Sequence, residues 1–260
     1  DGLTWTGSSS AQLDANNLRN KDVFAYDPRT FEFFGGVNRG GSVVLMRKEV
    51  APNIHDKSKP QIVIGAIDGT RTWAQLLLWG VDELDWNARF VVGYPGTSSL
   101  VLAVRRGEVD MIATSNIEML QSLLKTGDFV GLSQYGQMED GKIVARSSFP
   151  DVPLVSDQLE KANLTGLAKE TFKYWVSTLQ YDKWYALPPK TPKDIVAAYK
   201  AAWAKTSKDA KFLKEGSLQF SRDFRPMTGQ DMLDIVNVTA YPKDEYLDHL
   251  ANMRVKYGLP

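Results

Sequence analysis

The chain has 260 residues, of which 43% are hydrophobic, and its 31 Lys and Arg balance 31 Asp and Glu. A chain of this size needs neither disulfides nor a structural metal ion to be stable. The neutral charge argues against a nucleic-acid partner, which would require Lys and Arg gathered on one face. The sequence has no cysteine, which excludes thiol chemistry and cysteine metal sites and is compatible with an oxidising compartment.

The first residues of the chain do not have the pattern of a targeting segment. Asp1-Gly2-Leu3-Thr4-Trp5 has neither the basic start nor the apolar core of a signal peptide. We therefore expect the chain to begin after processing or truncation. No apolar run approaches the roughly 18 residues that a membrane span requires.

Short β-branched runs alternate with helical segments from residue 62 onward. The predicted elements, in chain order, are a strand over 62–64, a helix over 70–79 ended by Gly80, a strand over 90–92, a helix over 97–106 closed by Gly107, a strand over 109–113, a helix over 117–125 followed by Gly127, and a strand over 129–132. Glycine at a helix end favours the left-handed C-cap. This alternation is typical of a parallel sheet covered on both faces.

Helices dominate the second half of the chain. We expect a helical region between 154 and 175, then an extended segment over 176–187. Thr191 is predicted to be an N-cap, with Pro192 at the first helical position. The helix that follows has an apolar face, made of Ile195, Ala198, Tyr199, Ala202 and Trp203. Two further helices are predicted near 230–238 and 243–257.

Small polar residues follow three successive predicted strands, in clusters at 65–72, 93–99 and 114–116. Ligands of open parallel sheets bind beyond the carboxyl ends of the strands. Each cluster also opens a helix, whose free N–H groups favour an anion. We expect these loops to line one cleft and to hold a carboxylate without a buried countercharge. The candidate ligand-binding residues are Asp68, Thr70, Arg71, Thr72, Trp73, Tyr94, Gly96, Thr97, Ser98, Ser99, Thr114, Ser115 and Asn116.

Each candidate also has a simpler interpretation. The hydroxyl residues could be ordinary N-caps. Trp73 and Tyr94 either stack on a ligand or pack in the core. Arg71 could pair with a carboxylate in bidentate fashion, although a solvated arginine is the commoner case. Asp68 either binds a donor group of the ligand or caps the helix.

Enzyme signatures are missing from the sequence. There is no Gly-x-Ser-x-Gly turn, no His-Glu-x-x-His pair and no dinucleotide-binding glycine pattern. The histidines, His55 and His249, lie outside the three clusters, and neither has a second ligand at metal spacing. We therefore expect no catalysis, no cofactor and no metal site.

Several stretches resemble one protein family. The segment 93–99, continued by 103–110, resembles the "GYxG…LAxxRGEVD" segment of the extracytoplasmic solute-binding receptors of tripartite tricarboxylate transporters, also called Bug receptors. Residues 149–153 resemble the family's "FPDVPT" turn, and residues 186–196 resemble its "APPGTPxxIV" helix entry. Residues 1–4 resemble its "DGYTL" segment. The resemblance follows the family's order along nearly the whole chain.

This resemblance implies an α/β chain with the two-lobed type II periplasmic-binding-protein fold, in which helices cover mostly parallel sheets. One lobe would comprise residues 1–48 and 182–260, and the other residues 49–181. The implied protein is a periplasmic or extracytoplasmic receptor, which we expect to be a monomer. It would capture a small organic carboxylate in the interlobe cleft and deliver it to membrane transporter subunits.

The class of carboxylate stays open between a dicarboxylate, a tricarboxylate and an aromatic acid. Trp73 stands where many family members have histidine, and Asp68 interrupts a run of glycine and serine. Two alternatives to a transport receptor also stay open. One is a ligand-sensing domain of the same fold with a signalling partner. The other is an enzyme, which would need a nucleophile and a base in the cleft.

The resemblance also places the start of the chain inside a lobe. In the family, "DGYTL" follows a first strand, a glycine-containing ligand loop and a helix, whereas residues 1–4 stand at the very beginning here. We therefore expect the N-terminal lobe to be truncated in the given sequence, together with part of the ligand site.

Overall fold

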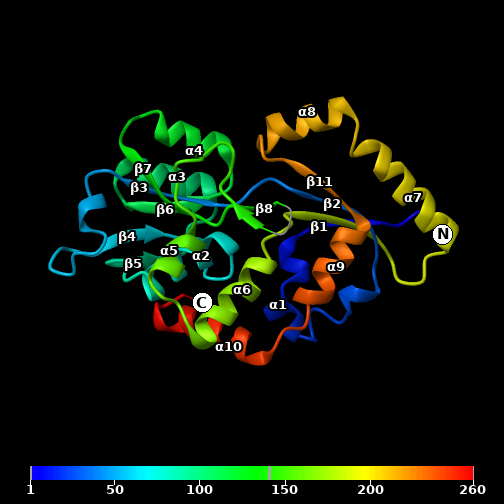
Figure 1. Ribbon diagram of the computed structural model, residues 1–260, viewed down its shortest axis with the longest axis horizontal. Coiled ribbons are helices and arrows are strands. Elements are labelled where there is room, and N and C mark those ends of the chain that lie inside the picture. The colour runs from blue at the N-terminus through cyan, green and yellow to red at the C-terminus, as the bar shows by residue number, and fades with distance from the viewer. Residues whose placement is uncertain (1, 140–141, 260) are drawn as a thin grey trace. The chain divides into compact units, whose positions relative to one another are not determined.

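A five-stranded sheet is the centre of one of two compact units in the computed structural model, which describes residues 2–139 and 142–259 (Figure 1). We call it the five-strand unit; it comprises Gly40–Lys169 and Asp248–Pro260. Its strand order is β5-β4-β6-β3-β7. The strands are β3 (Val43–Arg47), β4 (Ile62–Gly65), β5 (Ala88–Val91), β6 (Met111–Thr114) and β7 (Phe129–Gln134).

The pairing in this sheet combines parallel and antiparallel strands. β4 runs parallel to β5 and to β6, as the alternation of strands and helices predicts. Strand β3, which was not predicted from the sequence, lies between β6 and β7 and is antiparallel to both. The predicted fourth strand, β7, therefore joins the sheet through β3.

Helices cover both faces of the five-stranded sheet. They are α2 (Thr72–Glu83), α3 (Thr97–Arg106), α4 (Ile117–Leu124) and α5 (Val155–Lys161). Val43 and Leu45 of β3 are fully buried in one cluster with apolar residues of α3 and α4. Because side chains alternate along a strand, Val44 and Met46 point to the opposite face, where α2 contacts β3. Figure 1 shows α3 and α4 on one side of the sheet and α2 and α5 on the other.

Two glycines that were expected to end helices behave differently. Gly107 is the C-cap of α3, with a left-handed φ of 73°, as predicted. The prediction that α2 ends at Gly80 is wrong, because the helix continues to Glu83. A Cβ atom at Gly80 would lie 2.1 Å from the Trp86 ring. Gly80 therefore permits close packing inside a helix and does not end one.

The four-strand unit comprises Asp1–Arg39 and Glu170–Leu247. Its sheet has the order β1-β10-β2-β11. The strands are β1 (Thr6–Ser9), β2 (Glu32–Asn38), β10 (Lys183–Leu187) and β11 (Arg225–Thr228). Every pair in this sheet is antiparallel, which corrects the expectation of a mostly parallel sheet in this part of the chain. The mixed α/β class itself is confirmed.

Helices pack against both faces of strand β2. The pairing with β10 shifts register between Tyr185 and Ala186, opposite Phe34. Phe33 belongs to the cluster formed with α9 (Gly229–Thr239), whereas Phe34 packs against α7 (Lys193–Thr206). Gly35 faces the Trp203 ring of α7, and a Cβ there would lie 2.3 Å away. The absence of a side chain lets α7 approach the strand closely.

The remaining elements are helices and a two-stranded hairpin. They are α1 (Ala15–Arg19), α6 (Gly166–Ser177), α8 (Ala210–Gln219) and α10 (Asp244–Lys256), three short 3₁₀ helices at Ser10–Leu13, Pro28–Thr30 and Ala51–Asn53, and the hairpin strands β8 (Gln137–Glu139) and β9 (Lys142–Val144). The predicted helical region 154–175 is divided into α5 and α6. Pro192 is the N-cap of α7, so the cap lies one residue later than predicted. Thr191 instead donates its hydroxyl to the Pro188 carbonyl oxygen at 2.8 Å.

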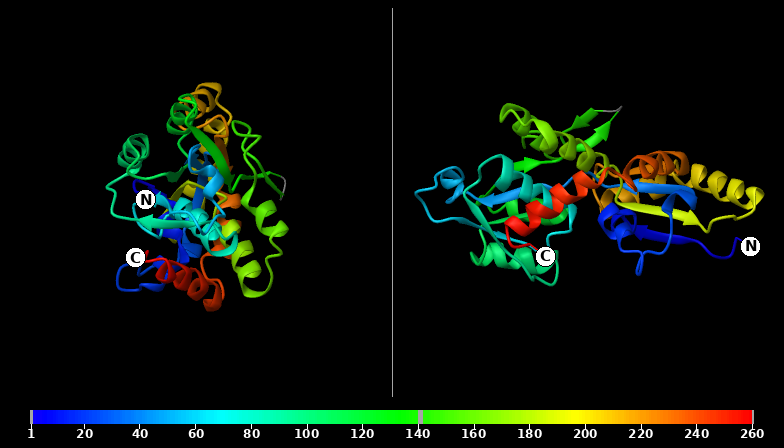
Figure 2. Two further views of the ribbon diagram at one scale, coloured as in Figure 1. Left: turned by 90° about the vertical axis from the view of Figure 1, so that its left-hand side faces the viewer. Right: turned by 90° about the horizontal axis from the view of Figure 1, so that it is seen from below.

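The bounds of the two units differ from the lobes expected from the sequence. The first crossing between them falls at residues 39–40, and residues 248–260 belong to the five-strand unit. There, Lys256 forms an ion pair with Asp82 of α2, and the Tyr257 hydroxyl donates to the same carboxylate at 2.9 Å. Figure 2 shows the C-terminal end of the chain, in red, beside the five-strand unit. Among the described helices, none combines the length and apolar character needed to cross a membrane.

Candidate functional site

The three polar clusters lie at one edge of the five-stranded sheet. They follow β4, β5 and β6, which are mutually parallel and so end at the same edge. The first two loops are also joined directly. The Gly93 N–H donates to the Ile67 carbonyl at 3.2 Å, and the Tyr94 N–H donates to the Ala66 carbonyl at 3.4 Å.

The loop after β4 is closed by Asp68. Its carboxylate accepts hydrogen bonds from the Thr70 amide at 2.9 Å, the Thr70 hydroxyl at 2.8 Å and the Arg71 amide at 3.3 Å. The Arg71 guanidinium also contacts it at 3.4 Å. Burial raises the pKa of this carboxyl, but the Thr70 hydrogen bonds and the Arg71 charge outweigh burial and hold it below the usual range. Asp68 therefore stabilises this loop as a carboxylate anion. The Thr70 hydroxyl donates its hydrogen bond to Asp68.

The loop after β5 leaves its polar groups available. Helix α3 begins at Thr97, and its N-cap is Gly96, which provides no side-chain hydrogen bond. None of the hydrogen bonds found within 2–139 and 142–259 uses the hydroxyls of Thr97, Ser98 or Ser99. A Cβ atom at Gly96 would meet nothing within 4 Å. The first turn of α3 therefore presents free amides and hydroxyls beside open space.

The loop after β6 is largely structural. The Asn116 side chain caps α4 by accepting from the Met119 amide at 3.0 Å. Thr114 is buried, and its hydroxyl accepts the Asn116 amide at 3.2 Å. Glu118 lies in the first turn of α4 and opposes an anion there. The N-cap of α4 is thus Asn116, and the N-cap interpretation of Thr114 and Ser115 is wrong. Ser115 contributes the polar side chain of this loop that is left for a ligand.

The two aromatic candidates are partly exposed and rest on the core. Trp73 and Tyr94 both pack against the apolar cluster that contains Leu100 and Val109. Their buried parts fix the two loops to the sheet. Helix α2 begins at Thr72. Its N-cap is Arg71, which makes no side-chain cap hydrogen bond.

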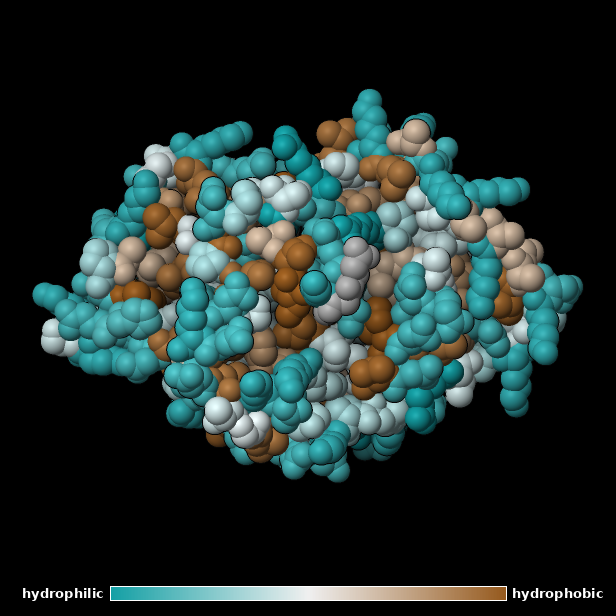
Figure 3. Space-filling view, viewed as in Figure 1, coloured by the Kyte–Doolittle hydropathy of each residue, from teal (hydrophilic) through white to brown (hydrophobic). Residues whose placement is uncertain are grey.

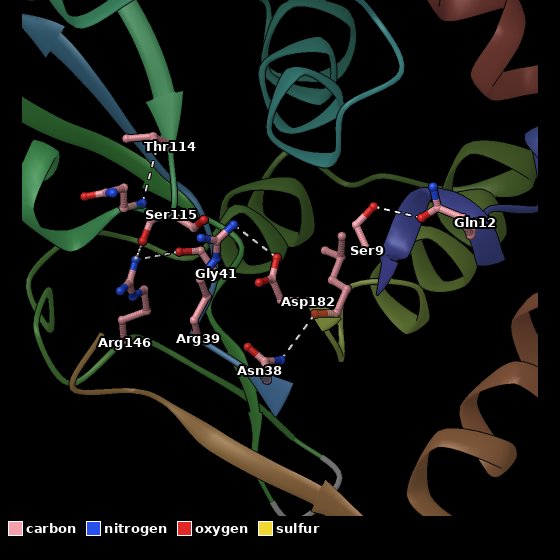
Figure 4. Close-up of polar contacts among 11 residues, drawn as sticks. Ser9, Gln12, Asn38, Arg39, Gly41, Thr114, Ser115, Arg146 and Asp182 are labelled. Atoms are coloured by element: carbon pink, nitrogen blue, oxygen red, sulfur yellow. Dashed lines mark hydrogen bonds and ion pairs between the residues drawn. The ribbon is translucent and has the colours of Figure 1, made fainter. Parts of the chain in front are cut away.

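Arg146, which is not among the residues expected from the sequence, holds the third loop through the Ser115 carbonyl. The side chain is fully buried. Its Nη1 atom donates to the Ser115 carbonyl at 3.1 Å and to the Gly41 carbonyl at 2.8 Å (Figure 4). Its backbone amide donates to the Gln134 side chain at 3.0 Å. No local pattern around residue 146 indicates this role, because its partners come from distant parts of the sequence.

The electrostatics of the edge favour an anion at α3. The N-terminus of a helix carries a partial positive charge and unpaired N–H groups. No acidic residue lies in the first turn of α3, whereas α4 has one and is capped. A carboxylate at Gly96–Ser99 would therefore accept hydrogen bonds from backbone amides and from up to three hydroxyls. Within the described part of the chain, no cluster of His, Cys, Asp and Glu could hold a metal ion.

Comparison with solved structures identifies the architecture. A TctC solute-binding protein from Polaromonas is 14% identical, with a TM-score of 0.64 over 98% of this chain and 79% of that chain. A Rhodopseudomonas palustris protein solved with adipate is 15% identical, with a TM-score of 0.63 over 100% of this chain and 79% of that chain. MatC from the same organism, solved with malate, is 17% identical, with a TM-score of 0.57 over 96% and 80%.

The chain has the fold of these solute-binding proteins. No protein-family model matches the sequence, and no curated protein matches it significantly. The solute-binding fold therefore rests on the arrangement of the elements, since identities of 14–17% are low. The type II periplasmic-binding-protein architecture expected from the sequence is confirmed at that level.

Proposed function

We propose that this chain is an extracytoplasmic solute-binding receptor of the tripartite tricarboxylate transporter type. It holds a small organic carboxylate and delivers it to membrane transporter subunits. The observation that carries the proposal is the uncapped first turn of α3, where Gly96, Thr97, Ser98 and Ser99 offer donors beside open space.

The chemistry of this turn suits an anion bound through hydrogen bonds. A hydrogen bond to a charged group contributes about 1.5–3 kcal/mol, roughly twice the value for neutral pairs. Donation by neutral groups leaves no buried countercharge behind when the ligand departs. A receptor that must release its ligand benefits from such a site. Two solved proteins of the same fold hold adipate and malate, so an aliphatic dicarboxylate is the first class to test.

Titration calorimetry with adipate, malate and benzoate tests this function. Benzoate serves as the aromatic alternative, and succinamide serves as an uncharged control of similar length to malate. The proposal expects saturable binding of a dicarboxylate, no binding of succinamide, and thermal stabilisation of about 2.7 kcal/mol at a hundredfold excess over the dissociation constant. Equal binding of succinamide and the dicarboxylates would contradict a site selected for anions.

A further inference from the structure

A cavity lies entirely within the four-strand unit, which does not contain the polar loops of the candidate carboxylate site. It measures about 150 Å³ and opens between the ends of β2 and β10 and the helix α8. Its walls are mostly apolar and include four aromatic side chains, Tyr185, Phe212, Phe220 and Phe224. An apolar cavity of about 150 Å³ holds one benzene-sized ring.

The aromatic walls are held in place by their own packing. The Phe212 and Phe224 rings meet edge to face at 5.6 Å, and Phe220 stacks on Phe224 at 5.7 Å. Tyr185 lies 5.2 Å from Trp203, which in turn contacts Phe212. A Cβ atom at Gly216 would lie 2.2 Å from the Phe224 ring, so this glycine lets the ring rest against α8. These ring contacts order the aromatic wall, which is suited to the face and edge of another ring.

The cavity is accessible, because part of its wall faces solvent. Phe220 is 38% exposed at the end of α8, and Leu213 and Leu218 of the same helix are also exposed. Figure 3 shows apolar side chains at the surface in the region of α8. The turn after α8 is fixed by buried Ser221 and Asp223, whose side chains are hydrogen bonded to each other at 3.1 Å.

The charges at the cavity cancel. Arg39 and Asp182 form an ion pair at 3.1 Å, and Figure 4 shows the two side chains pointing toward each other. Lys183 and Glu215 add one charge of each sign. A ligand with net charge would lose hydration against the aromatic walls. The rim has no excess of opposite charge that would offset this loss. A ring without net charge loses little hydration and can still form hydrogen bonds at the polar rim.

We propose that this cavity is a second ligand site, which takes a single aromatic ring of no net charge. It differs from the carboxylate site in unit, wall chemistry and charge preference, so either site can exist without the other. Phenol is the simplest probe, because it combines one ring with one hydrogen-bonding group. Benzoate and benzylamine carry the same ring with a negative and a positive charge.

Chemical-shift titration of the isotope-labelled full chain with phenol tests the site. We expect saturable shifts confined to residues 212–224 and the ends of β2 and β10. Phe220→Ala should weaken phenol binding roughly threefold to tenfold, as expected for the loss of one ring contact. Leu218→Ala is the matched control, since Leu218 is exposed on the same helix but does not line the cavity; it should leave phenol binding unchanged.

Two further variants test whether phenol binds in this cavity and is selected there by charge. Glu215→Gln should improve benzoate binding at this cavity relative to phenol binding, because it removes one negative charge from the rim. Thr97→Ala/Ser98→Ala should not alter the phenol shifts. Shifts outside the cavity, equal losses in F220A and L218A at unchanged melting temperature, or preference for a charged analogue in the unaltered chain would overturn the proposal. Loss of phenol binding through self-association at higher protein concentration would also overturn it, because the cavity would then belong to a contact with a second copy.

Discussion

The Asp68 carboxylate accepts the Thr70 hydroxyl at 2.8 Å. This hydrogen bond divides the candidate residues into two groups, because it removes Thr70 from the set that can serve a ligand. Thr114 and Asn116 are occupied in the same way in the loop after β6. The donors left at the sheet edge include Ser115 in the loop after β6 and the amides and hydroxyls at the start of α3, where no acidic residue opposes an anion.

Replacing Asp68 should affect stability more than ligand binding. Asp68→Asn should lower the free energy of unfolding by about 0.5–1 kcal/mol, after allowance for the partial exposure of the group. Because the folded-state pKa is depressed, this contribution is complete above the ordinary aspartate pKa and is lost as the pH falls through the folded-state value. Denaturant unfolding of both proteins at pH 7 and at pH 3 and below measures it, and the difference should shrink with acidification.

Asp56→Asn is the control for this experiment. Asp56 closes a similar turn by accepting the Ser58 amide at 2.9 Å and the Ser58 hydroxyl at 2.6 Å, in a loop away from the candidate site. Its pKa is also lowered by the Ser58 hydrogen bonds. A strong loss of carboxylate affinity in D68N, with none in D56N and equal stability of both, would show that Asp68 serves the ligand.

Arg146 should be required for the third loop. Arg146→Lys keeps the charge but cannot reproduce the fork of donors, so the Ser115 and Gly41 carbonyls lose partners in a buried place. We expect the free energy of unfolding to fall by about 2–5 kcal/mol. Arg105→Lys is the control, since the Arg105 contact with Ser122 is exposed and should change stability by less than about 0.5 kcal/mol. Equal melting temperatures of R146K and the unaltered chain would contradict this role.

Gly80→Ala should destabilise the protein although it lies within a helix. Alanine is favoured over glycine by about 1 kcal/mol in exposed helices. Here the added methyl group meets the Trp86 ring, and overpacking of this kind costs about 1–3 kcal/mol. Thermal unfolding should show a lower melting temperature for G80A, and Trp86→Leu in the same chain should recover part of it. A higher melting temperature for G80A would show that the ring moves freely.

The sequence predicted those features that depend on local or periodic signals. The parallel strands β4 to β6, the helix α3 and its left-handed end at Gly107 follow from apolar runs and glycine. The edge shared by the three loops follows from parallel pairing alone. These features require no knowledge of distant contacts.

The features that the sequence did not predict depend on contacts between distant segments. Gly80 resembles a helix end until Trp86 is seen against it, and the two glycines of β2 reduce the strand signal although α7 and α9 need them for close packing. The hydroxyl clusters look alike in the sequence. Only their partners distinguish the occupied Thr70 and Thr114 from the available Thr97 and Ser98.

Filling the space at Gly96 should impair binding without harming the fold. The residue has an extended φ of 178°, which any amino acid adopts, and a Cβ there meets no atom within 4 Å. Gly96→Val should therefore leave the melting temperature within a few degrees while its side chain occupies the place of the carboxylate. Calorimetry at equal protein concentration compares the two chains, and unchanged affinity in G96V would place the ligand elsewhere.

The most direct test of the proposed site is the carboxylate affinity of Thr97→Ala/Ser98→Ala, measured by titration calorimetry beside the melting temperature of the same protein. The two hydroxyls form no hydrogen bond within the described chain, so their loss should leave the melting temperature essentially unchanged. Each hydrogen bond to a charged ligand is worth about 1.5–3 kcal/mol, so the dissociation constant should rise at least tenfold. An unchanged dissociation constant, with or without a lower melting temperature, would contradict a carboxylate site at the start of α3.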